Sequence, residues 1–151
     1  MNADTVFSIC NYGVLPAWAL LALAPKLKLT QIVVHQVWIP ALLALFYIWA
    51  FATGPEPIEG AGFGSLQELA LLFQSPMALL AGWIHYLAFD LFVGAWQVRD
   101  AQRRGINHWL VVPCLFATLM AGPIGLLLYA CLRGAMKQVA TWNETEPAGN
   151  A

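Results

Sequence analysis

The sequence predicts an all-α integral membrane protein with four transmembrane helices. Hydrophobic residues fill 60% of its 151 positions and charged residues only 10%, whereas soluble domains carry roughly 25% charged residues. Four segments are each apolar over the roughly 20 residues that a helix needs to cross a hydrocarbon core of about 30 Å. Because so few polar side chains cannot cover a water-facing surface, we expect a single domain, residues 1–142, surrounded by a lipid bilayer.

The first two predicted spans are residues 6–24 and residues 32–51. The first ends at Pro25 and Lys26, and the second ends at the turn sequence Thr53-Gly54-Pro55. A secretory signal peptide begins with a positively charged region. The five residues before the first span contain no Lys or Arg. We therefore expect the first span to be retained.

The longest predicted connection, residues 54–65, reads GPEPIEGAGFGS and is typical of turns. Ser65 and Glu68 then form a capping box that opens a short helix over residues 66–74. That helix is too short to span a bilayer, so we expect either an interfacial or re-entrant helix or a plain amphipathic connector.

The third predicted span covers residues 77–98 and the fourth covers residues 109–132, where Arg133 stops it. Pro123 lies deep in the fourth span and should free a carbonyl about one turn earlier. Residues 143–151 form a polar C-terminal tail.

The basic residues predict the orientation of the chain. Lys26 and Lys28 lie in the first connection, three arginines lie in the third, and the second connection is acidic. By the positive-inside rule the first and third connections face the cytoplasm, which puts both termini on the other side. Arg133 and Lys137 follow the fourth span, and as basic residues they argue against this orientation.

The composition disfavours several classes of function. The net charge of −1 gives no electrostatic case for binding nucleic acid. The three cysteines lie in apolar stretches without a C-x-x-C pattern, which indicates neither a disulfide framework nor a zinc site. His35 and His85 begin spans of opposite direction, so they should lie near opposite membrane faces. We therefore expect no metal site and no haem.

Asp90, near the middle of the third span, is the most informative residue. A carboxylate at that depth costs about 3 kcal/mol on insertion scales and tends to face a bundle interior or a wet cavity. At 100° per residue, Tyr86, Asp90 and Gln97 share one stripe of the helix, with Gly94 at its edge. Asp90 is therefore either a proton donor in a site or a hydrogen-bonding anchor between helices.

His85 lies on a different face, about 140° around the helix from Asp90 and about 7.5 Å along its axis. The two side chains could border one pocket from two sides of an interior helix. His85 is a candidate catalytic base or ligand-binding residue, and the alternative is a hydrogen bond to a neighbouring helix.

Aromatic and amide side chains inside the spans suggest a ligand. They could form a wall for a flat, conjugated or isoprenoid molecule, or they could be ordinary packing and interface anchors. The candidates among them are Asn11, Trp18, Phe89, Phe92 and Trp96.

Several blocks of sequence resemble one family. They are HYLAFDLFVGAWQVRDA at 85–101, RGINHW at 104–109 and AGPIGLLLY at 121–129, with the opening FSICNYGVLPAWALLALAP and the connection GFGSLQELALLFQSP. Together they are similar to the abscisic-acid-deficient-type, or neoxanthin-synthase-like, small membrane proteins of plants and their bacterial relatives. The resemblance covers nearly the whole chain, and the HYLAFD block is its most specific part.

The resemblance implies a membrane protein of carotenoid metabolism. In plants the reaction would isomerise an epoxy-carotenoid to its allenic product, which needs an acid to open the epoxide and a base to remove a proton. Asp90 and His85 match motif positions and are the implied acid and base, with Tyr86 as a hydrogen-bond donor. Arg99, Asp100 and His108 also match, and they would either hold the connection or bind a hydroxyl on the ring end of the ligand.

The resemblance leaves other roles open. The alternative to an isomerase is a non-catalytic carotenoid-binding protein or an accessory subunit of a larger membrane complex, for example a photosynthetic one. A homo-oligomer with transport activity linked to Asp90 is a third reading. Because no plastid transit segment precedes the first span, we expect a bacterial member in the inner (cytoplasmic) membrane. The only cofactor-like molecule expected is a bound carotenoid or isoprenoid.

Overall fold

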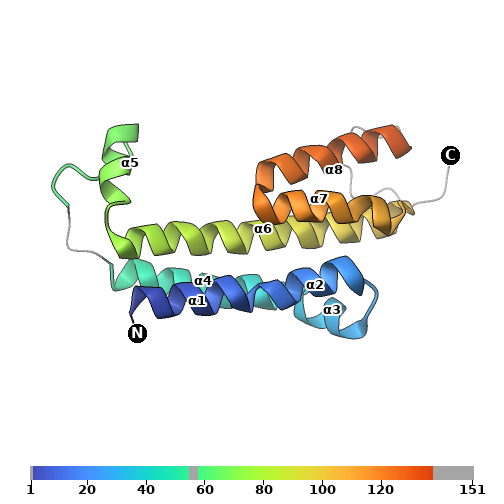
Figure 1. Ribbon diagram of the computed structural model, residues 1–151, viewed down its shortest axis with the longest axis horizontal. Coiled ribbons are helices and arrows are strands. Elements are labelled where there is room, and N and C mark those ends of the chain that lie inside the picture. The colour runs from blue at the N-terminus through green and yellow to red at the C-terminus, as the bar shows by residue number, and fades with distance from the viewer. Residues whose placement is uncertain (1, 55–57, 138–151) are drawn as a thin grey trace.

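A computed structural model of the chain describes residues 2–54 and 58–137, and every element in that part is helical (Figure 1). The predicted all-α class is therefore confirmed. The eight described helices are α1 (Ala3–Gly13), α2 (Leu15–Leu23), α3 (Lys28–Val33), α4 (Trp38–Ala52), α5 (Leu66–Leu72), α6 (Pro76–Arg104), α7 (His108–Met120) and α8 (Gly122–Lys137).

The 29-residue helix α6 is the axis of the fold. It begins at Pro76, a residue suited to the first helical position, while the Ser75 side chain accepts a hydrogen bond from the N–H of Ala78. It ends where Gly105 adopts a left-handed conformation, with φ of 64°. Helices α1, α2 and α4 lie along one side of α6, and α7 and α8 lie on the other (Figure 1).

Three helical segments are long and apolar enough to cross a membrane, judged by length and composition only: Ala3–Leu23, Lys28–Ala52 and Pro76–Arg104. They correspond to the first three predicted spans. The second is interrupted between α3 and α4, where Val37 has a φ of 67°, a conformation that β-branched residues rarely adopt. The side chain of Arg99 reaches this break from α6, and its Nη1 donates to the carbonyl of His35 at 3.3 Å.

The fourth predicted span differs from the structure. Residues 109–132 do not form one continuous helix, because the chain turns at Ala121, with φ of −160° and ψ of 79°. Pro123 has no N–H to continue the helix, and Gly122 admits a tight approach of neighbouring groups. Helices α7 and α8, of 13 and 16 residues, instead pack against each other as a hairpin (Figure 1). The prediction of four transmembrane helices is therefore not confirmed.

Contacts with α6 give the direction of the hairpin. Tyr86 binds Leu119 at the end of α7, whereas Asp100 binds Arg133 near the end of α8. Helix α8 thus returns to the end of α6 from which α7 departed. The end of α8 lies at the opposite end of the molecule from the start of α1 (Figure 1), whereas the basic residues had predicted both termini on one side. The polar tail, residues 143–151, lies outside the described residues.

The hairpin gathers the basic positions at one end of the molecule. The end formed by the α2–α3 turn, the α6–α7 turn and the end of α8 contains all seven Lys and Arg positions of the sequence: 26, 28, 99, 103, 104, 133 and 137. This distribution satisfies the positive-inside rule without exception, which a continuous fourth span could not do.

The predicted N-cap at Ser65 is confirmed, but the reciprocal bond of the capping box is shifted by one residue, from the N–H of Ser65 to the N–H of Gly64. The Ser65 hydroxyl accepts from the N–H of Glu68 at 3.2 Å, and the Glu68 carboxylate accepts from the N–H of Gly64 at 3.0 Å. Helix α5 stands across the direction of α6, near its first residues (Figure 1). The Phe73 ring at the end of α5 packs against Gly82 of α6.

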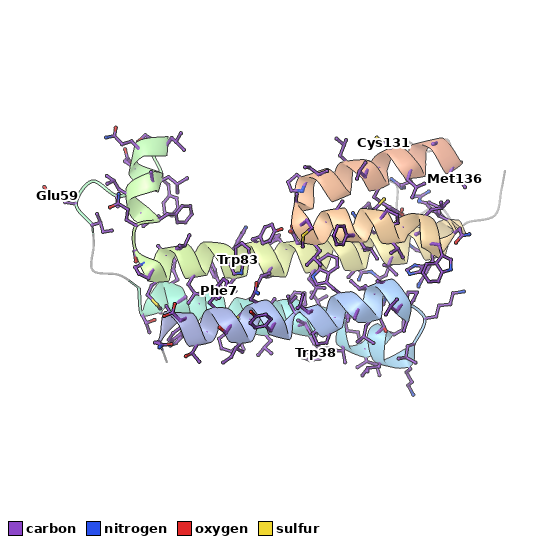
Figure 2. All side chains as sticks on the ribbon, viewed as in Figure 1. Phe7, Trp38, Glu59, Trp83, Cys131 and Met136 are labelled. Atoms are coloured by element: carbon purple, nitrogen blue, oxygen red, sulfur yellow. The ribbon has the colours of Figure 1, made fainter. Side chains whose placement is uncertain are left out.

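The hairpin predicts which residues face the same side of the membrane. In a cysteine-free background, Met136→Cys and Lys28→Cys should react with a membrane-impermeant thiol reagent from the same side, and Glu59→Cys should react from the other. Met136 and Glu59 lie at opposite ends of the molecule (Figure 2). Labelling of residue 136 from the side of residue 59 would show that the fourth segment crosses the membrane completely.

Candidate functional site

The predicted polar stripe of α6 is present and faces the hairpin. The Tyr86 hydroxyl donates to the carbonyl of Leu119 at 3.0 Å. About three helical turns further on, the amide nitrogen of Gln97 donates to the carbonyl of Gly125 at 3.2 Å. Asp90 lies between them and is 9% exposed. The stripe therefore contacts the hairpin on both sides of the break at Ala121.

Asp90 lies directly against the break between α7 and α8. A Cβ added at Gly122 would collide with the Asp90 carboxylate, so only glycine lets the carboxylate come this close to the first residue of α8. The second carboxylate oxygen, Oδ2, is buried and has no hydrogen-bond partner among the described residues. The break thus holds a carboxylate of which one oxygen is free to bind something further.

His85 faces the other side of α6. Its ring stacks on Phe89 with centroids 4.4 Å apart and lies 6.1 Å from the Tyr47 ring of α4. The side chain is exposed and lines a cavity of about 700 Å³ between α4, α5 and α6. This position is the one that its 140° separation from Asp90 predicts.

The cavity is predominantly apolar, and the titratable side chains in its described lining are those of His85 and Tyr47. Its lining includes Tyr47, Phe51, Phe73, Met77 and Ala81. Asp90 and Tyr86 are not part of that lining. The structure therefore does not bring the three catalytic candidates together: one borders the cavity, and two contact the hairpin.

The ligand-binding candidates within the spans are dispersed. Asn11 accepts a hydrogen bond from the Trp83 indole at 3.2 Å. Trp96 packs edge-on against Tyr129, and the Trp18 ring, which is 5% exposed, packs on Gly94. Two further candidates present outward faces of α6, with exposed fractions of 58% for Phe89 and 45% for Phe92. None of these residues lines the cavity.

The candidates at the membrane edge belong to an ion-pair cluster that holds the hairpin. Asp100 is 1% exposed, and its carboxylate lies 3.0 Å from Nε of Arg104 and 3.1 Å from Nε of Arg133. The Tyr129 hydroxyl donates to the same carboxylate at 2.7 Å. These contacts favour holding the connection, one of the two roles that the resemblance left open.

The other two edge residues also contact backbone carbonyls. A ring nitrogen of His108 lies 2.9 Å from the carbonyl of Ala22, and Arg99 contacts His35. Within residues 2–54 and 58–137, no group of three or more His, Cys, Asp or Glu side chains is placed to hold a metal ion.

Sequence reasoning missed Tyr129 and Arg133 as partners of Asp100, and Tyr47 and Phe73 as walls of the cavity. Its sequence position alone made Arg133 the end of the fourth predicted span and an indicator of orientation, not a partner of Asp100. Arg103 and Arg104 follow Asp100 by three and four positions, a spacing that favours ion pairs on a helix. No signal in the sequence could have placed Phe73 over α6, since that contact depends on how the connection folds.

The described residues form a small all-helical protein with three helical segments long and apolar enough to cross a membrane, a lateral apolar cavity and a polar helix break. The chain belongs to the ABA DEFICIENT 4-like family, whose model matches residues 5–129. The protein ABA DEFICIENT 4, chloroplastic, of Arabidopsis thaliana is 27% identical over 135 residues, which cover 83% of this chain and 59% of that protein. The chain thus spans about three-fifths of the length of that relative. No solved structure matches it.

The contact of Gly94 with Trp18 predicts a steric effect. A Cβ at residue 94 would lie 2.7 and 2.8 Å from two atoms of the Trp18 ring, so Gly94→Ala should lower the free energy of unfolding by about 1–3 kcal/mol. Gly134→Ala is the matched control, because nothing lies within 4 Å of its added Cβ. Chemical unfolding in detergent measures both, and equal effects of the two substitutions would contradict the packing described.

The Asp100 cluster predicts a loss of stability. Asp100→Asn would leave the buried Arg133 guanidinium short of its counter-charge and should lower the free energy of unfolding by roughly 3–5 kcal/mol. Arg103→Gln is the control, because its side chain is 46% exposed and an exposed pair contributes about 0–1 kcal/mol. If Asp100→Asn is as stable as Arg103→Gln, the cluster does not hold the hairpin.

Proposed function

We propose that this protein acts in carotenoid metabolism, as a membrane isomerase that holds the ring end of a carotenoid in the cavity between α4, α5 and α6. Membership of the ABA DEFICIENT 4-like family supports the pathway. The observation that carries the proposal is an exposed histidine on the wall of a largely apolar cavity of about 700 Å³.

The depth of the cavity suits a ring end. Asp90 lies at the midpoint of α6, and the lining residues Met77 and His85 lie about 20 Å and about 7.5 Å from it along the axis. If that midpoint lies at the bilayer centre, the cavity occupies the outer part of one leaflet, whose hydrocarbon half is about 15 Å thick. A carotenoid that spans a bilayer has its rings at such depths and its polyene near the centre.

One histidine can perform the isomerisation. A protonated His85 would donate its proton to the epoxide oxygen, which breaks a carbon–oxygen bond and forms a hydroxyl group. The neutral imidazole would then take a proton from the adjacent polyene carbon as the allene forms, which restores the imidazolium. Proton and electron counts balance without a further reagent, and general acid–base catalysis of this kind contributes typically 10²–10⁴-fold.

We assign the acid and base chemistry to His85 and not to an Asp90–His85 pair. Asp90 and Tyr86 contact the hairpin and do not line the cavity. This separation also favours a second candidate, a non-catalytic carotenoid-binding or accessory role. The inner membrane of a bacterium, as a multi-pass protein, is the location that we propose for either role.

The catalytic proposal predicts that one substitution can abolish carotenoid conversion without abolishing carotenoid binding. In cells that make epoxy-carotenoids, His85→Gln should reduce conversion by at least 10²-fold while the purified protein still carries pigment. Gly82→Leu, which fills the cavity beside Phe73, should abolish both pigment and conversion. Extraction of pigments and the absorption spectrum of the purified protein measure the two effects.

The matched control is His35→Gln, at the other end of the molecule, which should leave conversion unchanged. Pigment bound by the unsubstituted protein without any conversion would favour the accessory role. A colourless protein that also leaves every pigment unchanged would refute the proposal in both forms.

A further inference from the structure

The break between α7 and α8 is electrostatically unbalanced. The end of α7 carries a partial negative charge of about half an elementary charge, and the start of α8 carries a similar positive one. Because the two ends meet at Ala121, these partial charges largely cancel. The carboxylate of Asp90, which is 91% buried against Gly122, then remains as a nearly full negative charge.

The basic residues of the described helices are far from this charge. Arg99, the first basic residue after Asp90 on α6, is nine positions away, or about 13 Å along the axis. Arg133 on α8 lies eleven positions beyond Gly122, or about 16 Å. The groups that face Asp90 are the Tyr86 hydroxyl and the backbone at Gly122. Neither group is cationic, and among the residues that the structure describes the titratable side chain in contact with Asp90 is that of Tyr86.

We propose that Asp90 and the α7–α8 break form a binding site for a monovalent cation, a proton or a sodium ion, halfway along α6. The partnerless Oδ2 of Asp90 is the charged ligand. Helix ends interrupted within a membrane supply backbone carbonyls as further oxygen ligands, as in ion-coupled transport proteins. The site lies on the opposite side of α6 from the cavity and does not depend on the proposed carotenoid chemistry.

A structural role for Asp90 alone explains less. If the carboxylate only capped the start of α8, a neutral amide of the same shape would serve as well, and no oxygen need remain unpaired. A buried polar atom without a partner is rare in folded proteins. A bound cation accounts for the free oxygen and for the missing counter-charge together.

Thermal unfolding of the purified protein in detergent tests the proposal. Sodium chloride is titrated against choline chloride at constant ionic strength and fixed pH, and pH is then varied in choline chloride alone. A sodium-dependent rise of the unfolding midpoint that Asp90→Asn abolishes identifies a sodium site. A pH-dependent midpoint that Asp90→Asn abolishes, with no response to sodium, identifies a proton site.

Asp4→Asn, an exposed residue of α1, is the matched control and should keep the response of the unsubstituted protein. If that protein and Asp90→Asn respond alike to both titrations, the proposal is overturned.

A measurement on the unsubstituted protein keeps the test decisive if Asp90→Asn does not fold. Dicyclohexylcarbodiimide adds to protonated carboxyl groups in apolar surroundings, and mass spectrometry locates the adduct. Labelling of Asp90 that sodium suppresses supports the sodium site, and labelling that only alkaline buffer suppresses supports the proton site. The absence of labelling at Asp90 in both acidic and alkaline buffer contradicts the proposal.

Discussion

The fold depends on polar side chains of α6 that bind backbone carbonyls at the breaks between α2 and α3, between α3 and α4, and between α7 and α8. Unsatisfied backbone groups cost several kcal/mol each in hydrocarbon, so irregular backbone persists there only where protein groups or water bind it. Tyr86 and Gln97 bind carbonyls of the α7–α8 hairpin. Arg99 and Gln102 bind carbonyls of the breaks on either side of α3. The continuous helix α6 therefore stabilises the interrupted helices that pack against it.

The same constraint explains how the hairpin is anchored. Its tip is fixed by the stripe of α6, and its return is fixed by Asp100, which binds groups from its own helix and from α8. Burying the carboxylate of Asp100 would be costly if the guanidinium groups of Arg104 and Arg133 did not lie beside it. The pairing thus ties the end of α8 to the end of α6. The basic positions consequently share one end of the molecule, and the orientation that they favour agrees with the hairpin.

Much of this arrangement follows from the sequence. The first three spans follow from apolar length, and Ser65 with Glu68 marks the start of α5. Angular spacing alone places Tyr86, Asp90 and Gln97 on one face and His85 on another. The hairpin of α7 and α8 could not be predicted from the sequence. Proline is tolerated within membrane helices, so the Gly-Pro pair at 122–123 is compatible with a kink as well as with a turn. The hairpin is instead determined by its hydrogen-bond partners on α6, which are 21–33 positions away in sequence.

The cavity could not be predicted for a related reason. Its walls come from the end of α4, the helix α5 and the first half of α6, and their approach depends on a long connection whose turns the sequence only outlines. Apolar composition predicted a ligand site somewhere among the spans. It could not distinguish Phe73 and Tyr47, which line the cavity, from Phe89 and Phe92, which do not.

The separation of His85 and Asp90 by five positions has a functional consequence. In a helix this spacing turns two side chains to nearly opposite faces, so a rigid ligand in the cavity cannot touch both. A reaction that required the two residues as acid and base would need one ligand to reach both faces of α6, and the hairpin covers Asp90. The HYLAFD block therefore serves two surfaces of one helix. In the function that we propose, the histidine face contacts the ligand, whereas the aspartate face contacts the break between α7 and α8.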